Sequence, residues 1–423
     1  MRAIPLALAI IAALLGAHAA SAQDLSRAKP EDLGFSSERL ERITKIFRED
    51  AAHGKAPGFV LLIARHGKLG YFEAIGALNP ETNAPMTGDA IFRIYSMTKP
   101  ITQVAAMLLY EEGRITLDEP IAKYLPQFKD IKVGIEKADP AGGQPTLDLV
   151  PAQRPILIHD LMRHTSGLTY GDFGDLLVKK AYNDAGLTKG DFDNAEFADR
   201  LAKLPLAFQP GTTWDYGHST DILGRLIEIV SGKSLYRFEK ERLLDPLDMK
   251  DTSFYVNDPT KQNRVAEPFK DDRTFGIDAE FNDPRVAGKW EAGGDGMVGT
   301  ATDYARFLQM LLSGGALDGK RYLGPKTIAY MTPDHLGNVI VPGPYYLPGP
   351  GYGFGLGFAV RLDQGVSPRM GNPREYDWGG VGGTYFWVDP REDMFVVFMM
   401  QSPRQRLHYY ALIRDMIYAA LVN

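Results

Sequence analysis

The chain contains no cysteine among its 423 residues. This absence excludes a disulfide framework, a thiol nucleophile, a cysteine-ligated metal site and a lipid-modified cysteine. A chain of this size without disulfides has to be stabilised by a hydrophobic core, and 44% hydrophobic with 24% charged residues is an ordinary globular composition. The length is compatible with two to three lobes or domains.

Basic charge is also scarce. Lys and Arg number 47 against 53 Asp and Glu, which gives a formal net charge of −6. No dense Lys/Arg run with interleaved aromatic residues occurs, so we expect no nucleic-acid partner. No His-Glu-x-x-His motif is present, and His159 and His164 are five residues apart, so they do not share a helix face. We therefore expect neither a metal nor a cofactor.

The N-terminal segment differs in character from the rest of the chain. A single charged side chain, Arg2, precedes an apolar run from Ile4 to Leu15, and residues 20–22 (Ala-Ser-Ala) fit the small-x-small pattern of a signal-peptidase site. The apolar run is shorter than the ~20 residues that a membrane-spanning helix needs. We expect residues 1–22 to be a cleaved signal peptide. The mature chain would then have no stable membrane anchor and would be periplasmic or secreted in a bacterium.

Both ends of the mature chain carry strand signals. The stretch Gly58 to Gly76 predicts two strands joined by a turn at residues 65–68, and Gly383 to Gln401 predicts a second hairpin that turns at residues 389–393. Helical spacing of apolar residues adds one helix to each end, at the segments "SERLERITKIFREDAA" and "LHYYALIRDMIYAALV".

The middle of the chain has a different pattern of predicted elements. From Pro100 to about Arg285, helical segments alternate with Pro- and Gly-rich turns, and few convincing strands occur. The predicted fold class is α/β (α+β), with an antiparallel sheet that is built from both chain ends and flanked by helices. The predicted domains are an α/β sheet domain of residues 23–99 and 286–423 and an inserted, mainly helical domain of residues 100–285.

The short sequence "YSMTKP", residues 95–100, carries a catalytic signal. Residues three apart on a helix lie on one face, so Lys99 would place its amine over Ser96. Pro100 is tolerated only in the first turn of a helix, which places Ser96 at the helix start, where free backbone N–H groups can bind an oxyanion. A lysine in a dry site can lose its proton and act as a base. One turn of helix would thus supply nucleophile and base.

The same spacing also fits a helix cap at Ser96 and a solvated charge at Lys99. A second match, "SRAK" at Ser26 to Lys29, demonstrates that the spacing alone is weak evidence. Context distinguishes the two matches. An apolar helix follows Ser96, whereas Ser26 has no core around it and is expected to lie in a mobile tail.

Three motifs occur in order along the chain: "SMTK" at Ser96, "WDYGHSTDILGRLIEIVSG" around Tyr216, and "DWGGVGGTYFWVDP" around Trp378. Together they resemble the motifs of the serine β-lactamase and penicillin-binding protein superfamily. The third motif and the phrase "LMRHTSGL" at residues 161–168 are most similar to the family VIII carboxylesterases, which are esterases on a class C β-lactamase-like scaffold. The resemblance covers nearly the whole mature chain and implies a β-lactamase/transpeptidase-like fold.

The resemblance implies roles for the residues of the first two motifs. Ser96 would be the acylated nucleophile, Lys99 would assist its deprotonation, and Tyr216 would relay protons between nucleophile, base and leaving group. Without the motif order, Tyr216 would equally fit a buried aromatic residue with a satisfied hydroxyl. His218 replaces the polar amide residue of β-lactamases two positions after the tyrosine. It would be a partner of the tyrosine, or a capping or turn residue before the helix at Ser219.

The third motif departs from the β-lactamase pattern. Trp378, Gly379 and Gly380 stand in place of Lys-Thr-Gly, and the main-chain N–H near Val381 would form the oxyanion hole together with that of Ser96. Trp378 has no charge with which to hold a β-lactam carboxylate, which argues for uncharged ester substrates.

The predicted function is therefore that of a serine hydrolase that cleaves a small-molecule carboxylic ester through an acyl-enzyme on Ser96. A β-lactamase, a D-amino-acid peptidase or an acyltransferase would use the same chemistry on a β-lactam-like or related substrate. A non-catalytic penicillin- or peptidoglycan-binding module is the alternative outside catalysis. The sequence does not indicate the oligomeric state.

Overall fold

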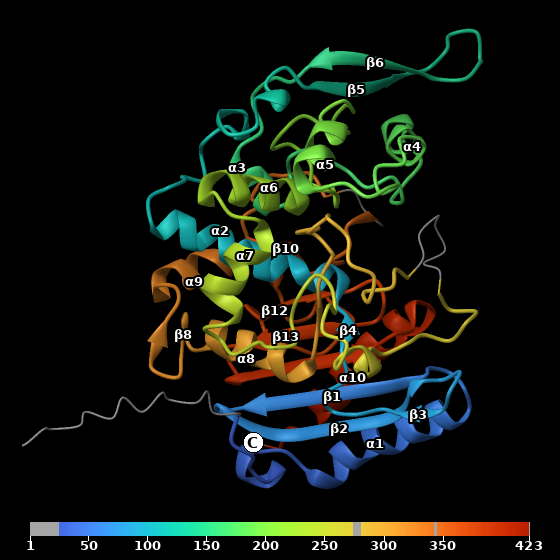
Figure 1. Ribbon diagram of the computed structural model, residues 1–423, viewed down its shortest axis with the longest axis vertical. Helices are drawn as coiled ribbons and strands as arrows, with labels where there is room; N and C mark the ends of the chain where they lie inside the picture. The colour runs from blue at the N-terminus through green and yellow to red at the C-terminus, as the bar shows by residue number, and fades with distance from the viewer. Residues whose placement is uncertain (1–24, 274–280, 342–344, 423) are drawn as a thin grey trace, which may run out of the picture.

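The computed structural model describes residues 25–273, 281–341 and 345–422, so the predicted signal peptide at residues 1–22 lies outside the described chain and stays a prediction. Its largest element is an eight-stranded antiparallel sheet with the order β10-β11-β12-β13-β14-β1-β2-β3 (Figure 1). The strands are β1 Gly58–Arg65, β2 Lys68–Asn79, β3 Ala84–Pro85, β10 Tyr352–Phe354, β11 Ala359–Arg361, β12 Tyr376–Gly379, β13 Tyr385–Asp389 and β14 Met394–Met400. Strands β1 and β14 pair along their length, so the sheet is built from both chain ends as predicted.

Both predicted hairpins are confirmed. Strands β1 and β2 are joined by His66 and Gly67, whose φ angles of 56° and 68° are the left-handed values that a two-residue type I′ turn requires. Strands β13 and β14 pair through a turn in which Asp393 has a φ of 47°. The turn positions agree with the predictions, because polar and glycine residues at these points interrupt two runs of apolar residues.

The sheet is covered on both faces. Helices α1 (Ser37–Ala52) and α10 (Arg406–Ala420) pack on one face, and α8 (Ala301–Leu312) packs against β14 and β1 on the other. Successive side chains of β1 point to opposite faces and enter two separate cores. One core contains Val60, Leu62 and Ala64, and the other contains Phe59, Leu61 and Ile63. Strand β1 is therefore buried on both sides, which accounts for its continuous apolar sequence.

The regular secondary structure of the segment between the two ends is mostly helical, as predicted (Figure 1). Its helices are α2 Thr98–Glu111, α3 Ile158–Met162, α4 Leu177–Asp184, α5 Asn194–Leu201, α6 Ser219–Ser231 and α7 Leu235–Glu239. It also contains an antiparallel hairpin of β5 (Lys132–Lys137) and β6 (Thr146–Pro151), which was not predicted. The domain boundaries at residues 99 and 286 stay predictions. None of the helices in the described ranges is both long and apolar enough to cross a bilayer.

Five further short elements lie outside the large sheet. Strands β4 (Phe92–Arg93) and β7 (Val298–Gly299) pair beside the residue 96 turn, while β8 (Ala316–Leu317), β9 (Lys320–Arg321) and helix α9 (Pro325–Met331) follow α8. The β4–β7 pair joins the chain before α2 to the chain before α8.

The expectation of a mobile tail around Ser26 is wrong. The Leu69 N–H donates to Ser26 O over 2.9 Å, and the Ala28 N–H donates to Leu69 O over 3.0 Å. These bonds hold the segment against β2. The Ser26 and Lys29 side chains are nevertheless exposed, so the second match to the Ser-x-x-Lys spacing has none of the surroundings of a buried site.

Phe59 is expected to be a main determinant of stability on the α1/α10 side of the sheet. Its ring stacks on Phe47 at a centroid distance of 4.3 Å and meets Tyr409 edge to face at 4.9 Å. Phe59→Ala should lower the free energy of unfolding by about 3–5 kcal/mol, because a fully buried ring is lost and a cavity remains. Urea titration measures this difference. The exposed Leu407→Ala on α10 is the control and should change it by less than about 0.5 kcal/mol.

Candidate active site

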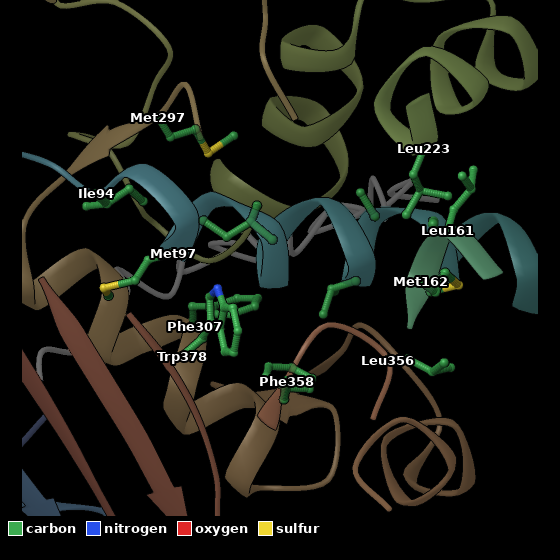
Figure 2. Close-up of a cluster of buried hydrophobic side chains, with 14 of the residues drawn as sticks. Ile94, Met97, Leu161, Met162, Leu223, Met297, Phe307, Leu356, Phe358 and Trp378 are labelled. Carbon is green, nitrogen blue, oxygen red and sulfur yellow. The ribbon is translucent and has the colours of Figure 1, made fainter. Parts of the chain in front are cut away.

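Ser96 lies in a short 3₁₀ turn, Tyr95–Met97, that runs directly into α2. Two hydrogen bonds with Met297 hold this segment in place. The Ile94 N–H donates to Met297 O over 3.0 Å, and the Met297 N–H donates to the Thr98 hydroxyl over 3.0 Å. Figure 2 shows Ile94, Met97, Met297 and Trp378 in one apolar cluster around the start of α2. The predicted position of Ser96 at a helix start is thus confirmed.

Tyr95, the residue before Ser96, has a φ of 45°. A left-handed conformation is uncommon for an aromatic residue and costs about 1–3 kcal/mol, so the surrounding structure has to enforce it. Close packing provides that constraint: a Cβ atom on Gly382 would lie 2.9 Å from the Tyr95 ring. The Tyr95 ring also meets Phe281 edge to face at 5.6 Å. The backbone conformation that presents Ser96 is therefore imposed by packing.

Lys99 is almost fully buried, with 1% of its surface exposed. Its Nζ lies 2.7 Å from Gly294 O, 3.2 Å from Ser96 Oγ and 3.3 Å from Tyr170 Oη. It also lies 4.6 Å from the centre of the Tyr216 ring. The predicted Ser96–Lys99 pair is thus in direct contact, and neutral acceptors and aromatic rings surround the amine.

Tyr216 and Trp378, taken from the second and third motifs, meet in the structure although 162 residues separate them. The indole Nε1–H of Trp378 donates to Tyr216 Oη over 3.2 Å. The ring centroids of the two residues lie 5.3 Å apart. Both side chains are buried, so Trp378 acts as a hydrogen-bond donor to Tyr216 as well as an apolar wall.

Tyr170 is the residue of the site that sequence reasoning missed. Its hydroxyl accepts from Lys99 Nζ, and its ring meets Tyr216 at a centroid distance of 5.3 Å. Burial raises the pKa of Tyr170 well above its usual value, so the phenol is neutral. The available signal was its position two residues after the phrase "LMRHTSGL", but no local pattern indicates that its hydroxyl reaches a lysine 71 residues away.

His218 lies beside Tyr170 and not beside Tyr216. The two rings meet edge to face at 4.5 Å, and His218 Nδ1 lies 3.0 Å from Asp221 Oδ2. Since a carboxylate accepts, the Nδ1–H donates to Asp221. His218 occupies the N-cap position of α6 without a side-chain capping bond. The structure places it at the helix start, one of the two predicted positions, where its ring contacts Tyr170, which in turn contacts the lysine.

The turn between β12 and β13 packs against the segment that carries Ser96. A Cβ atom on Gly380 would lie 2.5 Å from Ile94 O, and the Thr384 hydroxyl donates to the same oxygen over 3.2 Å. The Gly380 N–H donates to Thr384 O over 2.7 Å, so this amide is used within the turn. The Gly379 residue pairs with β13, which leaves the half-buried Val381 as the next backbone position on this side.

A glycine-rich loop closes the other side of the lysine. The Gly294 carbonyl accepts from Lys99, and the Gly294 N–H donates to Asp221 Oδ1 over 2.9 Å. Asp295 follows directly. Burial and the Asp221 charge raise the pKa of Asp295 to about 6, and a proton on Lys99 acts in the opposite direction. The site therefore contains two carboxyl groups, those of Asp221 and Asp295, that are connected to Lys99 through Gly294.

His164 is fully buried behind Tyr216 at a ring-centroid distance of 4.8 Å. Burial and the Lys99 charge hold the pKa of His164 well below its usual value, so the ring is neutral. Its carbonyl accepts from the Asp215 N–H over 2.9 Å, which fixes the chain next to Tyr216. Within the described residues, no group of three or more His, Asp or Glu side chains is arranged to hold a metal ion.

Comparison with known proteins gives matches over most of the chain. The model of the family described as Beta-lactamase matches residues 43–415. An uncharacterized protein of Mycobacterium tuberculosis is 33% identical over 365 residues, which cover 84% of this chain and 88% of that protein. Esterase EstB of Burkholderia gladioli is 29% identical over 401 residues, which cover 89% of this chain and 95% of the esterase.

Solved structures confirm the fold. EstCE1, a hydrolase with promiscuous acyltransferase activity, superposes with a TM-score of 0.74 at 27% identity and covers 90% of this chain and 98% of its own. Simvastatin synthase (LovD) of Aspergillus terreus superposes with a TM-score of 0.73 at 25% identity and covers 91% and 99% of the two chains. The predicted β-lactamase/transpeptidase-like fold is therefore correct.

Asp295 is expected to lower the stability of the protein at neutral pH. Because its pKa is about 6 in the folded state, against 3.8 for the unperturbed group, the folded protein binds this proton more tightly than the unfolded chain. Asp295→Asn should therefore raise the free energy of unfolding by about 1–3 kcal/mol at pH 7, and the gain should vanish near pH 4. Urea titrations at both pH values measure this. The exposed Asp184→Asn is the control; an equal effect in both variants would contradict the assignment.

Proposed function

This chain belongs to the beta-lactamase family, and on that premise we propose that it is a serine hydrolase that cleaves carboxylic esters through an acyl-enzyme on Ser96. The observation that carries the proposal is the contact of 3.2 Å between Ser96 Oγ and the buried Nζ of Lys99. A structural serine cap has no need of a buried lysine at this distance, because burying an ammonium group costs several kcal/mol unless other contacts offset it.

The arrangement of acceptors around Lys99 supports its role as the base. A neutral amine carries two N–H hydrogens and one lone pair. If Gly294 O and Tyr170 Oη accept the two hydrogens, the lone pair is left for the hydroxyl hydrogen of Ser96. A base and a nucleophile are then pre-oriented within hydrogen-bond reach, as nucleophilic catalysis requires.

In the proposed reaction, Ser96 Oγ attacks the ester carbonyl while its proton passes to Lys99. The backbone N–H groups of Ser96 and Val381 stabilise the oxyanion of the tetrahedral intermediate. The C–O bond to the alcohol then breaks, and we assign to Tyr216 the transfer of its proton to the leaving alcohol oxygen. Lys99 gives Tyr216 the proton that it took from Ser96, so both groups return to their starting forms. Water repeats the sequence on the acyl-enzyme and regenerates Ser96. Trp378 supports the relay through the hydrogen bond that its indole N–H donates to Tyr216 Oη.

The charges around the site favour uncharged substrates. Trp378 stands where the related β-lactamases carry a cation, and the nearby Asp221 and Asp295 would repel a substrate carboxylate. The names of two relatives point the same way: Esterase EstB and the lovastatin esterase of Penicillium rubens, which is 29% identical over 80% of this chain. A small carboxylic ester is therefore the proposed substrate class.

Acyl transfer is the second candidate, because an acyl-enzyme passes its acyl group to any alcohol that reaches it before water does. The specific support is the relative named acyltransferase mokF of Monascus pilosus, 30% identical over 326 residues that cover 73% of this chain and 75% of that protein. Adding a primary alcohol during ester hydrolysis distinguishes the two outcomes. Formation of the new ester in competition with the acid indicates transfer.

Ser96→Ala is expected to lower the kcat for p-nitrophenyl butyrate by at least about 1,000-fold, because the acylated oxygen is removed. A colorimetric assay of the purified variant measures this, and circular dichroism checks that the fold is retained. Ser26→Ala is the matched control, since it removes the serine of the other Ser-x-x-Lys match and should retain wild-type turnover.

Covalent labelling distinguishes the proposed hydrolase from the alternative functions. Fluorophosphonate should modify the wild-type protein at Ser96, with little stable penicilloyl adduct, as read by intact mass and peptide mapping. A long-lived penicilloyl adduct at Ser96 would indicate a penicillin-binding peptidase, and rapid turnover of a penicillin would indicate a β-lactamase. No adduct from either reagent would support the non-catalytic module and contradict the hydrolase.

Trp378→Phe should keep the apolar wall but remove the hydrogen-bond donor to Tyr216. We expect kcat for p-nitrophenyl butyrate to fall by about 5–10-fold with little change in KM, since one hydrogen bond is lost from the proton relay. Steady-state kinetics measures the two constants separately. A rise in KM at constant kcat would contradict the assignment and indicate that Trp378 contributes only to substrate binding.

A further inference from the structure

Glu239, the last residue of α7, is a buried carboxyl group outside the site described above. Its surface is fully enclosed. Oε1 lies 3.1 Å from the hydroxyl oxygen of Thr102 on α2, while Oε2 has no hydrogen-bond partner among the described residues. A carboxylate in such a place would be an unpaired buried charge, which proteins avoid by pairing or by protonation.

The contacts of Thr102 indicate which form is present. Its hydroxyl oxygen also lies 2.9 Å from the carbonyl oxygen of Gly293, so it contacts two oxygens at hydrogen-bond distance. A hydroxyl has a single hydrogen and can donate to only one of them. The carbonyl has no hydrogen to offer. Both contacts are hydrogen bonds only if the carboxyl group of Glu239 carries the second hydrogen.

The charges around Glu239 also favour its protonated form. The charged groups that influence it are Glu291 in the chain before the glycine loop and Glu228 on α6, and both are acidic. Burial first, and these two charges after it, raise the pKa of Glu239 well above its usual value, against the opposing effect of the Thr102 hydroxyl. Glu228 is itself paired with Arg225 over 2.9 Å, so that cation is already engaged.

The hydrogen-bonded chain ends at the loop that holds Lys99. Gly293 precedes Gly294, which binds Lys99 through its carbonyl and Asp221 through its N–H. The loop has little room to move. A Cβ atom on Gly293 would lie 3.0 Å from the carbonyl oxygen of Thr220, and one on Gly294 would lie 2.9 Å from the Asp221 carboxylate. A shift of the Gly293 carbonyl would therefore move the acceptor of the lysine.

We propose that Glu239 is a positioning residue: as a neutral acid it donates to Thr102, which donates to the Gly293 carbonyl and so orients the Gly294 carbonyl that binds Lys99. Loss of the proton turns the Thr102 hydrogen towards the carboxylate. The Thr102 and Gly293 oxygens then face each other at 2.9 Å without a hydrogen between them, and the loop moves. The role in the reaction rests on the proposed hydrolase function, whereas the protonation state does not.

Infrared difference spectroscopy tests the protonation state without any activity measurement. The full-length protein should show the C=O band of a protonated carboxylic acid at neutral pH, and this band should be missing from Glu239→Gln. The exposed Glu241→Gln is the matched control and should retain the band. Identical spectra of wild type and Glu239→Gln at neutral pH would overturn the proposal.

The pH dependence of ester hydrolysis tests the coupling to Lys99. Glu239→Gln replaces the O–H donor by an amide N–H that does not titrate, so kcat at neutral pH should stay within about threefold of wild type. Activity of the wild type should decline at alkaline pH as Glu239 ionises, and the glutamine variant should lose this decline. The same alkaline limb in both proteins would overturn the coupling even if the infrared band is present.

Thr102→Val provides a second variant that breaks the chain at its middle. It should lower kcat about tenfold at every pH, with little change in KM, since the Gly293 carbonyl loses its donor. Wild-type kcat in this variant would overturn the positioning role. If the wild type has no esterase activity, the hydrolase proposal fails, and the infrared result still decides whether Glu239 is protonated.

Discussion

The burial of the Lys99 amine is the constraint on which the rest of the site depends. An ammonium group removed from water needs compensation, yet none of the ion pairs within the described ranges involves Lys99. Its contacts are instead a backbone carbonyl, two hydroxyl oxygens and the face of an aromatic ring. These contacts hold its Nζ within hydrogen-bond reach of the Ser96 hydroxyl, as the proposed reaction requires. Chain segments that are distant in sequence must come together to provide them.

The glycine loop at residues 293–294 connects this amine to the helical part of the molecule. One carbonyl binds Lys99, the neighbouring one binds Thr102, and the amide between them binds Asp221. Small residues are required here because the loop passes close to α6 and to the Asp221 carboxylate. The position of the Lys99 amine is thus determined by helices α2, α6 and α7 together. At neutral pH the adjacent Asp295 is mostly ionised, which is the form that burial disfavours. Such a loss of stability is common where function and stability compete.

Much of the fold could be predicted because its signals are local. The β1–β2 and β13–β14 hairpins each combine apolar runs with a short polar turn, and α1 begins at a serine cap whose side chain accepts from the Arg39 N–H. The errors have physical reasons as well. The β5–β6 hairpin has a single fully buried side chain, that of Val133, so its strands gave a weak apolar signal. The segment at Ser26 is ordered by pairing with β2, which its own composition does not reveal.

The residues of the site also fall into those that the sequence predicted and those that only the structure revealed. The sequence by itself determined the Ser96–Lys99 pair, because a separation of three residues at a helix start places both side chains on one face whatever surrounds them. It also indicated Tyr216 and Trp378 through the order of the motifs, but not that they bond to each other. Only the tertiary structure decided that Tyr170 and Gly294 complete the surroundings of the lysine and that Glu239 is enclosed without a counter-charge. Contacts between residues far apart in the chain, and the protonation states that burial imposes, arise from packing, and no local pattern encodes packing.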